Sequence, residues 1–166
     1  ASPIPGEPGS FDATLTYYID FVAKGASISG FPEWLPSERV VEQRVIDTLR
    51  KVFELNGFIG IETRAVETGA SLLKKGETSK EIYLLSRLQE VGHESDTPIE
   101  ERLGLHFDLT VPLSRYVVEH SGALAFPFKR WQIQKVWRGE RPQEGRFREF
   151  VQADIDVIGA GDLPDH

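Results

Sequence analysis

The sequence has 166 residues, of which 40% are hydrophobic and 27% are charged, a composition typical of a soluble globular domain. The formal net charge of −7 argues against a broad basic surface for nucleic acid, so any RNA contact would be local. Without cysteine, disulfides and thiolate metal sites are excluded. The scattered histidines predict no metal site, and no apolar run reaches membrane-spanning length.

The first twenty or so residues are rich in proline and glycine and predict an irregular arm. We therefore divide the chain into an arm, residues 1–22, and a domain, residues 23–166. The sequence contains no methionine, not even at position 1. We interpret the chain as a processed protein or as a piece of a longer one.

An amphipathic helix is predicted from Ser37 to about Asn56. Ser37 can cap the free N–H groups, Glu38 suits the positive end of the helix dipole, and Gly57 follows as a stop. Apolar residues recur at helical spacing and predict one buried face, which comprises Val41, Val45, Leu49, Val52 and Phe53.

Shorter elements follow this helix. We predict a strand over residues 58–66, a short helix over 69–75 and a second strand over 79–89. A polar loop containing Gly92 is expected after the second strand.

A strand is also predicted over residues 103–111, followed by a helix from Pro112 to His120. Apolar residues alternate there with polar ones, so Asp108 and Thr110 share a face. A carboxylate beside a hydroxyl group can hold an ammonium group, although a half-exposed edge strand explains the alternation equally well. We interpret His106 as a structural histidine.

The most informative stretch is a predicted hairpin with strands over residues 128–138 and 148–158. Trp131, Ile133 and Trp137 fall on one side of the first strand, and Gln132, Gln134 and Arg138 on the other. The second strand alternates with period two. Its predicted buried face carries Glu149, Val151, Ala153, Ile155 and Val157, and its predicted accessible face carries Arg148, Phe150, Gln152, Asp154 and Asp156.

Two interpretations of this hairpin remain open. It is either an ordinary antiparallel pair with a polar loop or a site for an anionic ligand. In the second case Arg138, with another arginine across the loop, would bind phosphate or carboxylate. Phe150 would stack on a planar base, and Gln152 and Asp156 would recognise a polar or cationic group.

Residues 137–150, WRGERPQEGRFREF, resemble motif 2 of the class II aminoacyl-tRNA synthetases. They are most similar to the histidyl-tRNA synthetase version, F-R-x-E-R-P-Q-x-G-R-x-R-x-F. Residues 105–110, LHFDLT, likewise resemble that family's L-R-F-D-L-T segment. The likeness runs from about Gly30 to the end, with two notable departures: Arg64 stands where motif 1 usually has proline, and His106 stands where the family usually has arginine.

The resemblance implies an α+β fold, with an antiparallel sheet flanked by helices. Residues 23–166 would form the N-terminal part of the catalytic domain, with motifs 1 and 2. Motif 3 and the anticodon-binding domain have no counterpart here, so we expect an incomplete sheet with an exposed edge that favours self-association.

The implied reaction is the ATP-dependent activation of L-histidine to histidyl-adenylate, followed by transfer to tRNA(His). The implied catalytic residue is Arg138. The implied ATP-binding residues are Arg138, Glu140, Arg146 and Phe150. The implied histidine-binding residues are Asp108, Thr110, Arg138, Gln152 and Asp156.

The resemblance also implies Mg²⁺ bound with ATP, a homodimer formed through motif 1, and a cytoplasmic location. One alternative is the regulatory subunit of ATP phosphoribosyltransferase, a non-catalytic paralogue that does not keep motif 2 in full. Arg138, Glu140, Arg146 and Phe150 of motif 2 are all present here, which favours the synthetase. A synthetase-derived fragment without activity is the other alternative.

Overall fold

The structure is a computed structural model that describes residues 27–74, 81–90 and 97–159. The predicted arm lies outside the described residues, as do Gly76, Gly92 and the last seven residues of the chain.

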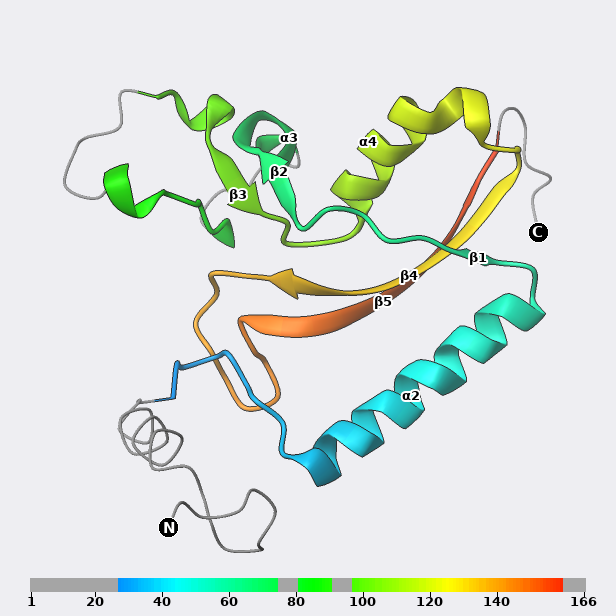
Figure 1. Cartoon of the computed structure of the whole chain (residues 1–166), viewed down its shortest axis with the longest axis horizontal. Helices are drawn as coiled ribbons and strands as arrows, with labels where there is room; N and C mark the ends of the chain where they lie inside the picture. The colour runs from blue at the N-terminus through cyan, green and yellow to red at the C-terminus, as the bar shows by residue number, and fades with distance from the viewer. Residues whose placement is uncertain (1–26, 75–80, 91–96, 160–166) are drawn as a thin grey trace, which may run out of the picture.

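The described chain is a mixture of helices and strands, which confirms the predicted α+β class (Figure 1). Single 3-10 turns lie at Leu88–Glu90, Ile99–Glu101 and Ser121–Ala123. The main elements are α2 (Pro36–Leu55), β1 (Ile59–Gly60), β2 (Val66–Thr68), α3 (Gly69–Leu73), β3 (Leu103–Leu105), α4 (Thr110–His120), β4 (Phe128–Trp137) and β5 (Glu149–Ile158).

The main sheet has the strand order β1-β4-β5, and a second, two-stranded sheet pairs β2 with β3. Strands β4 and β5 are antiparallel over their whole length, from the Phe128–Ile158 pair to the Trp137–Glu149 pair. Strand β1 runs parallel to β4. The main sheet is therefore mixed: β4 and β5 form the expected antiparallel pair, and β1 can join in parallel because β2, α3, β3 and α4 lie between β1 and β4 in the chain.

Helix α2 lies along one side of the β4–β5 hairpin, and β2, β3, α3 and α4 lie on the other side (Figure 1). Within the described residues, the outer edge of β5 pairs with no strand, as expected for an incomplete sheet. None of the described helices is long and apolar enough to cross a membrane. The buried apolar side chains are Leu72, Phe107, Leu109, Leu113, Phe128 and Val136.

Helix α2 has nearly the predicted bounds, but its start differs in detail. Leu35 is the N-cap residue and Pro36 is the first helical residue, a position that suits the fixed φ of proline. The carboxylate of Glu38 accepts the N–H of Leu35 at 2.9 Å. The prediction that Ser37 caps the helix is therefore wrong, whereas the stop at Asn56 and Gly57 is confirmed.

The predicted buried face of α2 is only partly correct. Leu49 and Phe53 are half-buried, but the side chains of Val41, Val45 and Val52 are 59%, 54% and 48% exposed. At 100° per residue, the three valines lie about a quarter turn around the helix from the face toward the sheet. They form an outward stripe, which we call the valine stripe.

Two of the predicted strands are wrong in extent. Residues 58–66 divide into β1, which joins β4, and the start of β2, which joins β3. In the described part of residues 79–89, Leu84 forms only an isolated bridge to Gly104. Neighbouring backbone bonds join Leu85 to Leu103 at 2.8 Å and Tyr83 to Leu105 at 2.9 Å. The chain then turns into a 3-10 helix.

The predicted strand over residues 103–111 ends at Leu105. Asp108 accepts the backbone N–H of Val111 at 3.2 Å through Oδ1, which satisfies a free donor of the first helical turn. Helix α4 consequently starts at Thr110 rather than Pro112. The short helix predicted over residues 69–75 is confirmed as α3.

The hairpin and the assignment of its two faces are confirmed, but the predicted burial of the faces is not. Ile155 and Val157, which were predicted to be buried, are 47% and 42% exposed. The polar face is half-buried along β5, and Arg130 and Gln132 on the same face of β4 are fully buried. The burial is reversed because the segment 61–65 covers the polar face, where Thr63 bonds Gln132 and Gln134.

Candidate functional site

A cavity of about 160 Å³ lies where the hairpin loop leaves the two strands. Arg138 directly follows β4, and Phe150 belongs to the first pair of residues in β5. The backbone N–H of Arg138 donates to the carbonyl oxygen of Arg148 at 2.8 Å, which closes the base of the loop. The residues around this cavity are Arg138, Glu140, Gly145, Arg146, Phe147 and Phe150.

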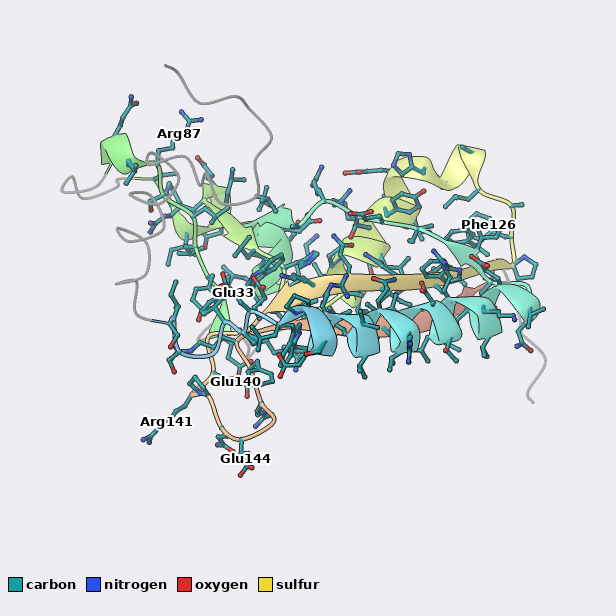
Figure 2. All side chains as sticks on the ribbon, turned by 60° about the horizontal axis from the view of Figure 1, so that its bottom comes forward. Glu33, Arg87, Phe126, Glu140, Arg141 and Glu144 are labelled. Carbon is teal, nitrogen blue, oxygen red and sulfur yellow. The ribbon has the colours of Figure 1, made fainter. Side chains whose placement is uncertain are left out.

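The loop folds back on itself through a tight turn. Gln143 and Arg146 exchange backbone hydrogen bonds of 3.1 and 2.9 Å, and Gly145 between them has a φ of +72°. That conformation favours glycine. Figure 2 shows Arg141 and Glu144 projecting from the loop, with Glu140 closer to the strands.

Arg138 is held by three contacts. Its Nε donates to the carbonyl oxygen of Phe107 at 3.0 Å, and one terminal nitrogen donates to Oε1 of Gln152 at 3.3 Å. Its Cζ lies 5.0 Å from the centre of the Phe150 ring, which is within the range of a cation–π contact. These contacts fix the guanidinium in place where Arg138 lines the cavity.

Glu140 and Arg146 form an ion pair of 3.0 Å across the loop, with side chains that are 19% and 60% exposed. The structure thus groups around one cavity the four residues predicted to bind ATP. The cavity offers two guanidinium groups, a carboxylate and an aromatic ring, which can bind phosphate groups and a planar base.

Further along the same face, Gln152 donates from Nε2 to Oδ2 of Asp154 at 2.9 Å. Asp156 forms an ion pair with Arg130 on β4, and the Asp156 side chain is 41% exposed. The antiparallel register places Phe150, Gln152 and Asp156 on one face of the hairpin, as the period-two pattern predicted.

The structure separates Thr110 from the Arg138 cavity. Thr110 is the first residue of α4, is exposed, and lines a different cavity of about 540 Å³ between α3 and α4. Asp108 is 4% exposed and bonds the start of α4. The strand face that was predicted to present both residues does not form. From this segment, the carbonyl oxygen of Phe107 contacts Arg138.

The two residues that depart from the family pattern have structural contacts. His106 is fully buried, donates from Nε2 to the carbonyl oxygen of Lys135 at 2.7 Å, and its ring lies 5.5 Å from that of Trp137. Arg64 contacts the buried carboxylate of Glu67 at 3.4 Å. Neither side chain lines the Arg138 cavity.

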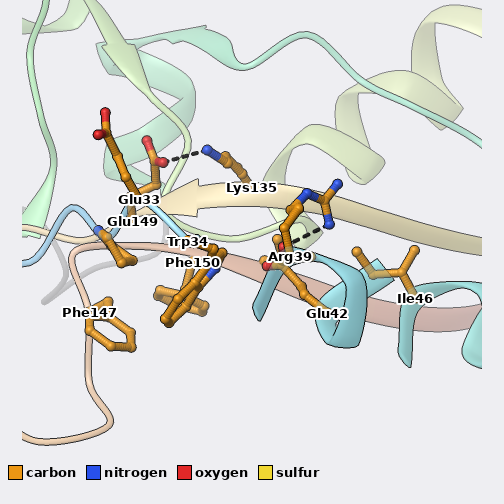
Figure 3. A pocket seen from close by; sticks show the side chains of 11 residues that line it. Glu33, Trp34, Arg39, Glu42, Ile46, Lys135, Phe147, Glu149 and Phe150 are labelled. Atoms are coloured by element: carbon orange, nitrogen blue, oxygen red, sulfur yellow. Dashed lines mark hydrogen bonds and ion pairs between the residues drawn. The ribbon is translucent and has the colours of Figure 1, made fainter. Parts of the chain in front are cut away.

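A larger cavity of about 450 Å³ lies between α2 and the hairpin (Figure 3). Phe147 and Phe150 line both this cavity and the one beside Arg138. Trp34 packs edge-on against Phe147, with 5.8 Å between the ring centres. The base of the loop therefore rests on the aromatic side chain of Trp34, from the segment before α2.

Two buried ionic residues, and the half-buried arginine that pairs with one of them, escaped the sequence reasoning. Glu67 on β2 is 1% exposed and Arg130 on β4 is 0% exposed. Arg115 on α4 bonds Glu67 at 2.8 Å. Only Arg130 left a signal in the sequence, since the hairpin register places it directly opposite Asp156. Within the described residues, no group of three His, Cys, Asp or Glu side chains is arranged to hold a metal ion.

No family model matches the sequence. A histidine–tRNA ligase of Bifidobacterium longum subsp. infantis is 99% identical over 145 residues, which cover 87% of this chain and 31% of that protein. The ligase of Micrococcus luteus is 64% identical over 149 residues, covering 86% of this chain and 32% of the relative. The chain is a homologue of histidine–tRNA ligases. It spans about 31% of the length of these relatives.

Solved structures agree with the homology to histidine–tRNA ligases. The histidyl-tRNA synthetase of Nostoc sp. PCC 7120 has a TM-score of 0.68 and 45% identity, over 83% of this chain and 29% of that one. A Bacillus halodurans protein described as an ATP phosphoribosyltransferase regulatory subunit/histidyl-tRNA synthetase has a TM-score of 0.67 but 22% identity, which shows the fold alone. The regulatory-subunit alternative is therefore not favoured.

Proposed function

We propose that this segment supplies ATP and histidine contacts for a histidine–tRNA ligase, which activates L-histidine as histidyl-adenylate and transfers it to tRNA(His). The observation that carries the proposal is the grouping of Arg138, Glu140, Arg146 and Phe150 around one cavity. The complete reaction belongs to the longer enzyme, because the chain spans about 31% of its relatives.

Arg138 is the proposed catalytic residue. Formation of the adenylate brings the histidine carboxylate toward the α-phosphate of ATP, and both groups are anionic. A guanidinium that binds the two together offsets their repulsion and orients the attack. The bonds from Arg138 to Phe107 and Gln152 fix the position of this cation before substrates bind.

The other three cavity residues are proposed to bind the rest of ATP. Phe150 would stack on adenine, Glu140 would accept a bond from the adenine amino group, and Arg146 would bind the terminal phosphates. Arg146 is 60% exposed in its ion pair with Glu140, and an ion pair with a solvent-exposed partner costs little to break, so Arg146 is available to the phosphates. Mg²⁺ would be held chiefly by phosphate oxygens and would neutralise their charge.

For histidine, we propose that Gln152 and Asp156 contact the imidazole ring. Both lie on the same face of the hairpin, and Gln152 bonds Arg138. Asp108 and Thr110 are proposed for the amino group. This second assignment requires the start of α4 to turn its polar groups toward Arg138, because Thr110 lines a separate cavity in the structure.

The complete enzyme is proposed to be a cytoplasmic homodimer. The valine stripe of α2 supports the dimer, because it is a line of half-exposed apolar side chains at helical spacing. Such stripes gain stability when a second copy of the same surface covers them.

The test is calorimetric titration of the chain with a non-hydrolysable histidyl-adenylate analogue. We expect saturable binding that Arg138→Ala weakens at least about tenfold, since charge-assisted bonds contribute roughly 1.5–3 kcal/mol. Arg141→Ala is the matched control, because Arg141 is exposed and projects from the same loop (Figure 2). Equal affinity for wild type and Arg138→Ala, or no binding by the folded wild-type chain, would contradict the proposal.

A further inference from the structure

Arg130 is a fully buried cation on the polar face of the hairpin. Its side chain is 0% exposed, and it lies directly across the β4–β5 ladder from Asp156. One of its terminal nitrogens forms an ion pair with Oδ2 of Asp156. Asp156 itself is 41% exposed, so the pair has one partner inside the protein and one at the protein surface.

A hydrogen-bond network of amide side chains also holds Arg130 in place. Its other terminal nitrogen donates to Oε1 of Gln132 at 3.4 Å, and Gln132 is itself fully buried. Gln132 in turn donates to Thr63 Oγ1 at 2.8 Å and to Gln134 Oε1 at 2.7 Å. Gln134 closes the network with a bond to the Thr63 carbonyl at 2.7 Å. The network ties the guanidinium to segment 61–65.

The charge of Arg130 determines how the Asp156 carboxylate is oriented. An arginine stays protonated inside a protein, so Arg130 needs an anion, and Asp156 supplies it. Burial lowers the pKa of Arg130, while the charges of Asp156 and Asp154 oppose that effect. Because an unpaired buried charge is strongly unfavourable, Asp156 is held facing Arg130. Its Oδ1 has no hydrogen-bond or ion-pair partner among the described residues.

We propose that Arg130 is a positioning residue for histidine recognition: it keeps the Asp156 carboxylate ionised and fixed by Oδ2, so that Oδ1 accepts an N–H of the substrate imidazole. This inference rests on the proposed function, and in particular on Asp156 as an imidazole contact. Arg130 acts only through Asp156 and does not contact the substrate. It therefore contributes to histidine binding but not to ATP binding.

The experiment measures the affinities of the chain for L-histidine and for ATP separately by calorimetry. The variants are Arg130→Met, Asp156→Asn, the double variant and Arg130→Lys. Lys129→Met is the matched control, since Lys129 is a cation on the opposite face of the same strand.

We expect Arg130→Met to weaken histidine binding at least about tenfold, the size expected for losing a charged hydrogen bond, and to change ATP binding less than about twofold. Arg130→Lys should restore most of the histidine affinity. The double variant should bind histidine no more weakly than Asp156→Asn alone, because residues that act through one another are not additive.

Different outcomes overturn different statements. If the folded wild-type chain binds ATP but not histidine, the histidine half of the proposed function falls and the inference falls with it. If wild type binds histidine and Arg130→Met binds it equally well, the inference alone falls. Additive effects in the double variant, or equal losses of ATP and histidine binding, would also overturn it. Should Arg130→Met fail to fold, the double variant and Arg130→Lys decide the question, because neither leaves the Asp156 charge facing an apolar replacement.

Discussion

The guanidinium of Arg138 lies over the ring of Phe150, with 5.0 Å between Cζ and the ring centre. This contact joins the two ends of the hairpin loop, since Arg138 follows β4 and Phe150 lies at the start of β5. It also means that one face of the aromatic ring is occupied by a cation before any nucleotide binds. The adenine proposed to stack on Phe150 would therefore use the other face, which would leave the cation beside the proposed phosphate position.

The first prediction concerns this ring. Phe150→Leu keeps an apolar side chain but removes the π face, and base–aromatic stacking contributes roughly 1–3 kcal/mol. We expect the calorimetric dissociation constant for ATP to rise about tenfold. Phe58→Leu is the control, because Phe58 also has a cation over its ring, Lys129 Nζ at 4.9 Å, but does not line the Arg138 cavity. Unchanged ATP affinity in Phe150→Leu would rule out stacking there.

The second prediction concerns the buried carboxylate of Glu67. Arg115 bonds both of its oxygens, at 2.8 and 3.0 Å, and removing one partner of a buried ion pair costs about 3 kcal/mol. Arg115→Met should therefore lower the free energy of unfolding in urea by about that amount. Arg39→Met, which removes an exposed pair with Glu42, should change it by less than about 1 kcal/mol. Similar effects of the two substitutions would contradict the assignment of Glu67–Arg115 as the stabilising pair.

The third prediction is a pH dependence. Burial raises the pKa of Glu149, but hydrogen bonds from Lys135 and Trp137 and the charge of Lys135 outweigh it, so that the pKa is lowered. The two bonds are 2.5 and 2.8 Å long, and Figure 3 shows the Lys135 contact. A lowered folded-state pKa means that the ionised group stabilises the protein above its unfolded pKa of about 4.3 and that this contribution is lost as the pH falls through the folded pKa.

Urea unfolding of wild type and Glu149→Gln between pH 3 and pH 7, a range that spans the glutamate pKa of about 4.3, tests this. We expect wild type to be the more stable protein at pH 7 and the difference to shrink below that pKa. A difference that does not vary with pH would show that Glu149 contributes through packing alone.

The fourth prediction uses two glycines. A Cβ atom on Gly69 would lie 1.9 Å from the carbonyl oxygen of Ile99, and a backbone atom cannot move aside as a flexible side chain does. Gly69→Ala should therefore lower the free energy of unfolding by about 1–3 kcal/mol, as overpacking typically does. At Gly122 a Cβ would meet nothing within 4 Å, so Gly122→Ala should leave stability nearly unchanged. Equal stabilities of the two variants would contradict the close approach of α3 and residue 99.

The fifth prediction concerns the valine stripe. If a second copy covers it, Val45→Glu places a charge in an apolar contact and should shift the sedimentation of the chain toward the monomer. Val118→Glu on α4 is the control, since Val118 is 76% exposed and lies outside the stripe. A wild-type chain that sediments as a monomer at high concentration would contradict the dimer.

The sequence by itself determined the elements that depend on local pattern. Repeats of 2 and 3.6 residues in the sequence predict the hairpin strands, their two faces and the bounds of α2. These repeats depend only on residues that are close together in the chain. The grouping of Arg138, Glu140, Arg146 and Phe150 also follows, because a short loop between paired strands brings its two ends together whatever surrounds it.

Only the tertiary structure decided which faces are covered. Thr63 lies about seventy residues from Gln132 in the chain, and its contact buries the polar face that alternation alone marked as accessible. The valine stripe, the short extent of β3 and the separation of Thr110 from Arg138 likewise depend on which segment packs against which. The role proposed for Arg130 depends on the tertiary structure in a similar way: the hairpin register sets it opposite Asp156, but only burial removes the water that would otherwise stabilise its charge.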